Sequence, residues 1–358
     1  MSQLFHGGRL RQASEQHQIP LSDWLDLSTG VSPWTYPFSH IDMSHWNQLP
    51  QDEDGLEAAA RSHFGAESLL AVAGSQMAIQ SLPFVWSQTR SLANKNRNDN
   101  YPPTVGLPYQ GYKEHEKAWL KAGWQVHHYD GMPTDKWVNE LSALVVINPN
   151  NPSGVNISKQ QLLCWQQTLL NNNGLLVVDE AFADIDNRQS LAAVSANNLV
   201  VLRSIGKFYG LAGIRVGFVI APNELLSRLS IELGPWVVAG PSREVAKQAL
   251  QDISWQKFQA DRLIKQANRL AALLKQMLTN KRLTDLHLHI QNDGRIASTG
   301  LFQTLYLHNA KQVHEQLCQQ AILVRLTDEE DALRFGLPKN DAQWDKLEYG
   351  LRQVFSEN

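Results

Sequence analysis

The fold is decided by the stretch LLVVDEAF at residues 175–182, in which an unbroken apolar run ends on a carboxylate. A second apolar run, LVVI at residues 144–147, ends on the amide side chain of Asn148. Continuous Val, Leu and Ile runs are typical of strands buried on both faces, as in parallel sheets covered by helices. The sequence therefore predicts an α/β fold with a mostly parallel, helix-covered sheet.

Strands and helices alternate outward from these two runs. Helices are expected at 55–64, 76–86, 114–121 and 159–170, and strands at 69–73, 104–107, 124–129, 143–147, 175–179, 199–203 and 216–221. Beyond residue 222 the pattern changes to long helices at 244–252 and 255–278, short strands at 286–290, 301–307, 323–325 and 333–335, and a last helix at 343–354. We expect a large domain at 41–222. An irregular N-terminal arm, 1–40, and a small α+β domain, 223–358, make up the rest.

Composition excludes several classes of protein. The 358 residues are 43% hydrophobic and 19% charged, and 32 Lys and Arg against 35 Asp and Glu give a net charge of −3. Without a basic excess we expect neither a nucleic-acid nor a membrane partner. The two cysteines, Cys164 and Cys318, make no metal-ligand spacing and fit a reducing compartment. We therefore expect no metal. The sequence also has no signal-peptide core and no run of about 20 apolar residues, so we expect a cytoplasmic protein.

Unusual residues gather where predicted strands end, which is where doubly wound sheets bind ligands. Gly74, Ser75 and Gln76 open a helix and could bind an anion, although, taken alone, they are better explained as a tight turn with Ser75 as N-cap. The loop NPNNPSG, residues 148–154, carries more amides than a plain turn needs. Asp179 is either a helix cap or a buried carboxylate that needs a partner.

The fourth strand end is the loop SIGKFYGLAGIR, residues 204–215. A lysine among glycines and aromatics is easily desolvated, and this lowers its pKa and makes Lys207 nucleophilic. The guanidinium of Arg215 can donate two parallel hydrogen bonds to a phosphate. A lysine, a carboxylate and an anion site are the groups that pyridoxal 5'-phosphate requires of a protein. The sequence therefore predicts an enzyme that uses this cofactor.

These motifs, in this order, resemble the fold-type I pyridoxal-phosphate enzymes of the aspartate aminotransferase superfamily. The resemblance implies the PLP-dependent transferase fold, a homodimer, Lys207 as the covalent lysine and Asp179 as the partner of the pyridine nitrogen. It further implies that Asn151 bonds the cofactor's 3'-oxygen. The remaining cofactor contacts that it implies are Ser204, Arg215 and the backbone of Gly74, Ser75 and Gln76 at the phosphate, and Tyr109 stacked on the ring; the alternative for Tyr109 is a buried core tyrosine.

Within the superfamily the chain is similar to histidinol-phosphate aminotransferases and to the threonine-phosphate decarboxylases of cobalamin biosynthesis. Three stretches favour the decarboxylases: FHGG at 5–8, WLDLSTGVSP at 24–33 and the lysine loop. The first resemblance implies a lyase that converts L-threonine O-3-phosphate to (R)-1-aminopropan-2-yl phosphate, and the alternative is an aminotransferase that uses 2-oxoglutarate. A cofactor-binding protein without activity is a third class, disfavoured by the intact lysine and carboxylate. The implied substrate residues are His6, Gly30, Asn151, Arg325 and Arg334, although either arginine could instead form an ordinary surface ion pair.

Two positions depart from the aminotransferase pattern. Phe182 stands where many of these enzymes have a tyrosine that bonds the 3'-oxygen, so that hydrogen bond is absent here. Leu49 precedes Pro50 where a Tyr-Pro pair often reaches the partner subunit's phosphate site. Whether the dimer completes the cofactor site in the usual way therefore stays open.

Overall fold

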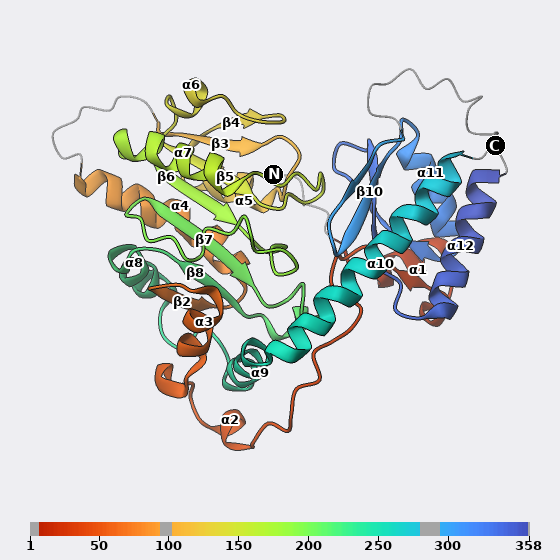
Figure 1. The fold of residues 1–358 in the computed structure, drawn as a ribbon, viewed down its shortest axis with the longest axis horizontal. Coiled ribbons are helices and arrows are strands. Elements are labelled where there is room, and N and C mark those ends of the chain that lie inside the picture. Colours follow the sequence, from red (N-terminus) through yellow and green to blue (C-terminus); the bar gives the residue numbers. More distant parts are fainter. Residues whose placement is uncertain (1–6, 94–101, 280–293, 357–358) are drawn as a thin grey trace. The chain divides into compact units, whose positions relative to one another are not determined.

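The computed structural model describes residues 7–93, 102–279 and 294–356 (Figure 1). The chain divides into two compact units. The larger comprises residues 36–151 and 155–256, and the smaller comprises residues 1–35, 152–154 and 257–358. No helix in the described ranges is both long enough and apolar enough to cross a membrane.

The larger unit is built on a seven-stranded sheet in the order β2-β8-β7-β6-β5-β3-β4 (Figure 1). Only β8 runs against its neighbours, whereas the other pairings are parallel, so the predicted mostly parallel α/β sheet is confirmed. The strands are β2 (Leu69–Val72), β3 (Thr104–Pro108), β4 (Gln125–Tyr129), β5 (Ala143–Ile147), β6 (Leu175–Asp179), β7 (Leu199–Ser204) and β8 (Gly217–Ile220).

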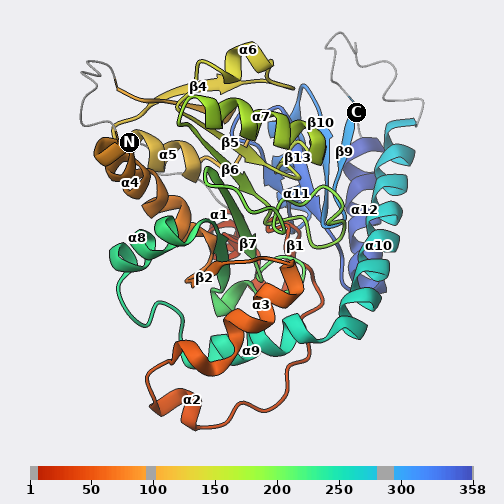
Figure 2. The same cartoon turned by 60° about the vertical axis from the view of Figure 1, so that its left-hand side comes forward.

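The apolar runs that predicted this sheet lie at its centre. Every residue of β5 and β6 is buried, and the two strands are in register from Ala143 with Leu175 to Ile147 with Asp179. One core cluster joins the sheet to α4 (Ser75–Ala93), α5 (Glu114–Lys121) and α8 (Asn223–Leu233), while α7 (Lys159–Asn171) packs on β6 (Figure 2). Burial of these apolar side chains fixes the strand ends on which the candidate residues stand.

The larger unit extends further along the chain than the sequence analysis placed it. Helix α8 packs on α4, and α9 (Gly240–Gln251) packs on α3 (Leu56–Phe64). Arg243 of α9 makes ion pairs with Asp54 and Glu57, at 2.7 and 2.6 Å. These contacts place residues 223–256 with the large sheet. Two short helices, α2 (Ser44–Asn47) and α6 (Asp135–Val138), also belong to this unit.

The smaller unit contains a four-stranded antiparallel sheet, β12-β13-β10-β9, and a parallel pair of β1 with β11. Its strands are β1 (Leu25–Asp26), β9 (Ile296–Ser298), β10 (Phe302–Tyr306), β11 (Ile322–Leu323), β12 (Arg325–Leu326) and β13 (Ala332–Gly336). Its helices are α1 (Leu10–His17), α11 (Ala310–Gln319), α12 (Asp341–Ser356) and most of α10 (Ile253–Thr279). The expected α+β character is observed.

Several expected elements differ in detail. The N-terminal arm is not wholly irregular, because residues 10–17 form α1, a helix whose weak apolar face buries only Ala13. Helices α8 and α11 were not expected, and residues 323–325 are divided between two short strands rather than forming one. The strand expected at 286–290 lies outside the described residues.

Candidate active site

The candidate residues of the larger unit meet at one edge of its sheet. Asp179 ends β6 and Ser204 ends β7, while Asn151 follows β5, Tyr109 follows β3 and the 74–76 turn follows β2. These five strands are mutually parallel, so their carboxyl ends share an edge. Arg215 precedes β8, which is antiparallel and therefore starts at that same edge. The topology thus brings together residues as far apart in the sequence as Gly74 and Arg215.

Asp179 is a buried carboxylate with two hydrogen-bond partners. It is 4% exposed, and its Oδ1 accepts from the backbone N–H of Ala181 at 3.1 Å. Its Oδ2 lies 3.0 Å from Nε2 of His115, which is also buried. A carboxylate has about four lone-pair sites, so it can accept a further N–H while both contacts persist.

Arg215 lies against the N-terminus of α4. A Cβ added to Gly74 would stand 2.7 Å from Arg215 Nη2, and Gly74 has a φ of +73° that favours glycine. A Cβ on Gly217 would stand 2.6 Å from the backbone nitrogen of Ser75. A guanidinium beside the positive end of a 19-residue helix puts two positive groups together, which is the arrangement of an anion site.

The side chain of Gln76 is engaged within the protein. Its carbonyl accepts from the Tyr112 hydroxyl at 2.8 Å, and its amide donates to Glu114 at 3.0 Å. Burial, aided by the charges of Glu114 and Asp179, raises the pKa of Tyr112 to about 12, so this hydroxyl stays a donor. Only the backbone of Gln76 is therefore suited to hold an anion.

Lys207 occupies the turn between β7 and β8, which buries both of its neighbours, Gly206 and Phe208. Its Nζ lies 5.6 Å from the centre of the Phe182 ring, a buried side chain that offers no hydrogen bond. Ser204 Oγ accepts from the backbone N–H of Gly206 at 3.2 Å and so fixes the start of the turn. The amine therefore lies near an aromatic ring at the edge of the sheet that carries Asp179.

The amide-rich loop after β5 is fixed by its own side chains. Asn148 donates to the carbonyl of Ile157 at 3.0 Å and accepts from its N–H at 2.7 Å. Asn150 donates to the carbonyl of Gln110 at 2.8 Å, which ties the loop to the residue after Tyr109. Tyr109 is 50% exposed, so the alternative of a core tyrosine is wrong.

In the smaller unit, Arg334 and Gly30 lie together. Arg334 sits in the middle of β13, is 6% exposed and donates to the carbonyl of Ser28. Its guanidinium carbon would be 3.5 Å from a Cβ at Gly30, whose φ of +62° also favours glycine. Burial, and secondarily the charge of Arg325, lowers the pKa of Arg334 to about 9.

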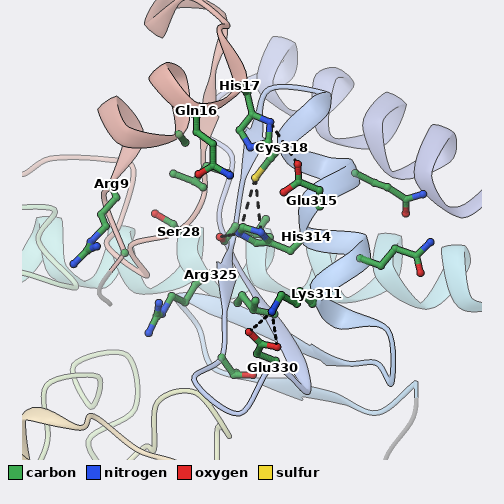
Figure 3. A pocket seen from close by; sticks show the side chains of 18 of the residues that line it. Arg9, Gln16, His17, Ser28, Lys311, His314, Glu315, Cys318, Arg325 and Glu330 are labelled. Atoms are coloured by element: carbon green, nitrogen blue, oxygen red, sulfur yellow. Dashed lines mark hydrogen bonds and ion pairs between the residues drawn. The ribbon is translucent and has the colours of Figure 1, made fainter. Parts of the chain in front are cut away.

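Arg325 faces Arg334 directly across the sheet, because β12 and β13 pair these two residues in register. Arg325 also lines a cavity of about 1200 Å³ in the smaller unit, together with Arg9, Ser28, His314 and Lys311 (Figure 3). The structure therefore brings together three predicted substrate residues, Gly30, Arg325 and Arg334. Of the other two predicted substrate residues, Asn151 belongs to the larger unit and His6 lies outside the described residues. Gly8, two positions after His6 in the arm, donates its N–H to Ser28 Oγ at 2.8 Å.

Comparison with known proteins places this geometry in a family. Residues 49–343 match the family described as aminotransferase class I and II. The chain is 40% identical, over 97% of its length and of the relative's, to the threonine-phosphate decarboxylase of Pseudomonas aeruginosa, and 32% identical, over 95% of both, to that of a Sinorhizobium species. The chain belongs to the class I and II aminotransferase family.

More distant relatives agree. A histidinol-phosphate aminotransferase of Blochmanniella floridana is 29% identical over 71% of both chains. Among solved structures, the histidinol-phosphate aminotransferase of Clostridium acetobutylicum matches with a TM-score of 0.76 at 18% identity, over 93% of this chain and all of that one. That of Sinorhizobium meliloti, in complex with pyridoxal 5'-phosphate, matches with a TM-score of 0.73 at 16% identity, over 99% and 96%. These structures share the fold of the family.

Enzymes of this aminotransferase family use pyridoxal 5'-phosphate, and the larger unit fits it. The Arg215 guanidinium at the start of α4 suits the phosphate, and the buried Asp179 suits a protonated pyridine nitrogen. Lys207 carries an amine of the kind that the covalent link to the cofactor needs. The phosphate, the pyridine nitrogen and the aldehyde of the cofactor thus each have a suitable residue at the same sheet edge.

Sequence reasoning missed His115 and Ser28. His115 lies on the face of α5 that also buries Glu114, Ala118 and Trp119, and two polar residues on the buried face of a short helix are the signal that could have found it. Ser28 belongs to the quoted stretch at 24–33 but was not singled out. Its hydroxyl fixes Gly8 and its carbonyl accepts from Arg334, so it joins the arm to the arginine.

Proposed function

We propose that the protein is a pyridoxal-phosphate-dependent lyase that decarboxylates L-threonine O-3-phosphate to (R)-1-aminopropan-2-yl phosphate, the reaction that cobalamin biosynthesis uses to make its aminopropanol linker. The observation that carries the proposal is the 40% identity, over 97% of both chains, to the Pseudomonas aeruginosa threonine-phosphate decarboxylase. The paired arginines in the smaller unit support it. A substrate with both a carboxylate and a phosphate needs two cations, and β12 and β13 present Arg325 and Arg334 in register.

The residues divide the chemical tasks among them. When bound, the cofactor supplies an aldehyde for the covalent link and a ring that accepts the electron pair of the broken bond. Lys207 provides the amine of that link and can return a proton to the substrate carbon. Asp179, held by His115, keeps a proton on the pyridine nitrogen. Arg334 binds the substrate carboxylate, which leaves as carbon dioxide while its bonding electrons stay with the carbon.

The test is to incubate the purified holoenzyme with L-threonine O-3-phosphate and measure both carbon dioxide and the amino alcohol phosphate. Equimolar release of the two is expected. Lys207→Ala should release neither, because no other group supplies the amine at this position. The second arm uses histidinol phosphate with 2-oxoglutarate, and glutamate formation without carbon dioxide would replace the proposal with aminotransfer.

We also propose that the enzyme is a homodimer in the cytoplasm. Four large apolar side chains, Phe38, Met43, Trp46 and Leu49, are exposed within twelve residues of the larger unit, and a second copy would cover them. Two free cysteines, Cys164 and Cys318, fit a reducing compartment. A monomeric mass by sedimentation at micromolar concentration would contradict the dimer.

A further inference from the structure

Arg325 forms an ion pair with a carboxylate of the turn that follows it. Its Nη2 donates to Asp328 Oδ1 at 2.6 Å, and the two side chains are 20% and 35% exposed. Both residues line the cavity of the smaller unit, on whose wall Figure 3 places Arg325 with Arg9 and Ser28. The ion pair therefore borders space that an anionic ligand can enter.

The turn that carries Asp328 is held firmly. Thr327, which precedes it, is 5% exposed. Its hydroxyl donates to the Asp331 carboxylate at 2.8 Å and accepts from the backbone N–H groups of Asp331 and Ala332 at 3.2 and 3.1 Å. The backbone N–H of Glu330 also donates to the Thr327 carbonyl at 3.1 Å. Asp328 is thus presented to Arg325 by an ordered turn.

The negative charge of Asp328 lies beside one of a pair of arginines. Arg325 and Arg334 stand opposite each other on adjacent strands, and like charges in that position repel. Burial together with this repulsion lowers the pKa of Arg334. An anion near Arg325 relieves the repulsion, and Asp328 is the carboxylate that its own sequence neighbourhood supplies.

Resting on the proposed function, we propose that Asp328 is a built-in competitor for the substrate phosphate on Arg325. In the free enzyme its carboxylate occupies the guanidinium, and an incoming phosphate monoester replaces it. A phosphate monoester carries up to two negative charges near neutral pH whereas a carboxylate carries one, so the ligand wins the exchange. The displaced ion pair lowers the affinity for every phosphate monoester that uses Arg325. Asp328 therefore limits how tightly the phosphorylated product is retained.

The test compares Asp328→Asn with the wild-type holoenzyme. The KM for L-threonine O-3-phosphate and the inhibition constant of the product should both fall about two- to fivefold, the size expected for a partly exposed ion pair. Calorimetric titration of the holoenzyme with inorganic phosphate should show the same gain. A tighter complex is an effect that local misfolding would not produce. Asp328→Glu restores a carboxylate and should return the constants toward the wild type.

Glu330→Gln is the matched control. It removes one negative charge from the same turn and the same cavity wall, but the ion pair that it breaks is the one of Glu330 with Lys311, at 2.8 Å. Unchanged or raised constants in Asp328→Asn, or an equal fall in Glu330→Gln, would overturn the proposal. If the wild type releases no carbon dioxide from L-threonine O-3-phosphate, the proposed function fails by itself. The phosphate titration then still decides the role of Asp328.

Discussion

Two buried arginines, Arg203 in the larger unit and Arg334 in the smaller, are surrounded in opposite ways. Arg203 donates to Glu180 at 2.8 Å and to Asp184 at 2.6 Å, and these two carboxylates outweigh desolvation and raise its pKa. Arg334 donates to a backbone carbonyl and faces a second arginine, and its pKa is lowered. The first has its counter-ions within the fold. The charge of Asp26 only partly offsets the effects that lower the pKa of the second, and we propose that Arg334 also binds an anionic ligand.

This contrast separates a structural charge from a functional one. A buried charge without sufficient counter-charge costs stability, and such a cost is expected where binding recovers it. The same difference appears within one strand end, since Asp179 lies at the sheet edge with the cofactor residues while Glu180, the next residue, is bound by Arg203, Ser190 and Leu191. Stability and activity should therefore respond oppositely to changes at the two arginines.

The largest expected effect on the fold comes from Arg203→Gln. It leaves Glu180 and Asp184 buried without their cation, and the free energy of unfolding should fall by about 3–5 kcal/mol. Urea denaturation followed by circular dichroism measures it. Arg203→Lys should lower the free energy of unfolding by less. An Arg203→Gln protein as stable as the wild type would contradict the structural role of Arg203.

Arg334→Gln should do the reverse. The value of kcat/KM for L-threonine O-3-phosphate should fall roughly 30-fold or more, because losing a buried charge partner of a ligand costs about 2–5 kcal/mol. The free energy of unfolding without ligand should be unchanged or higher. Steady-state kinetics and urea denaturation on one preparation test both halves, and a variant that is destabilised yet fully active would contradict the assignment.

The smallest expected effect is the pH dependence of that stability difference. The pKa of folded Arg334, about 9, is below that of the unfolded chain, so the unfolded state binds more protons above pH 9 and stability rises with pH there. The difference in the free energy of unfolding between Arg334→Gln and the wild type should therefore narrow by about 1.4 kcal/mol from pH 8 to pH 10, since each pH unit above the pKa is worth about 1.4 kcal/mol. A constant difference in the free energy of unfolding over this range would show that folding does not lower the pKa of Arg334.

The larger unit could be predicted well because each central strand of its sheet is a continuous run of apolar residues in the sequence. Buried strands β5 and β6 have the bounds that their apolar residues indicate, and the residues at their ends follow from the topology of a parallel sheet. The smaller unit was harder, because α11 is a short, mostly polar helix and β11 and β12 have two residues each. The His115 contact to Asp179 joins residues 64 positions apart, and the register of Arg325 with Arg334 depends on the turn between them. No pattern of neighbouring residues in the sequence predicts either the contact or the register.

The functional account depends on Lys207 more than on any other residue. Reduction of the holoenzyme with borohydride, followed by peptide mapping, tests this dependence most directly. The account predicts one labelled peptide, with the reduced cofactor on Lys207, and no label in Lys207→Ala. A label on a different lysine, or none in a wild-type protein that releases carbon dioxide, would contradict it.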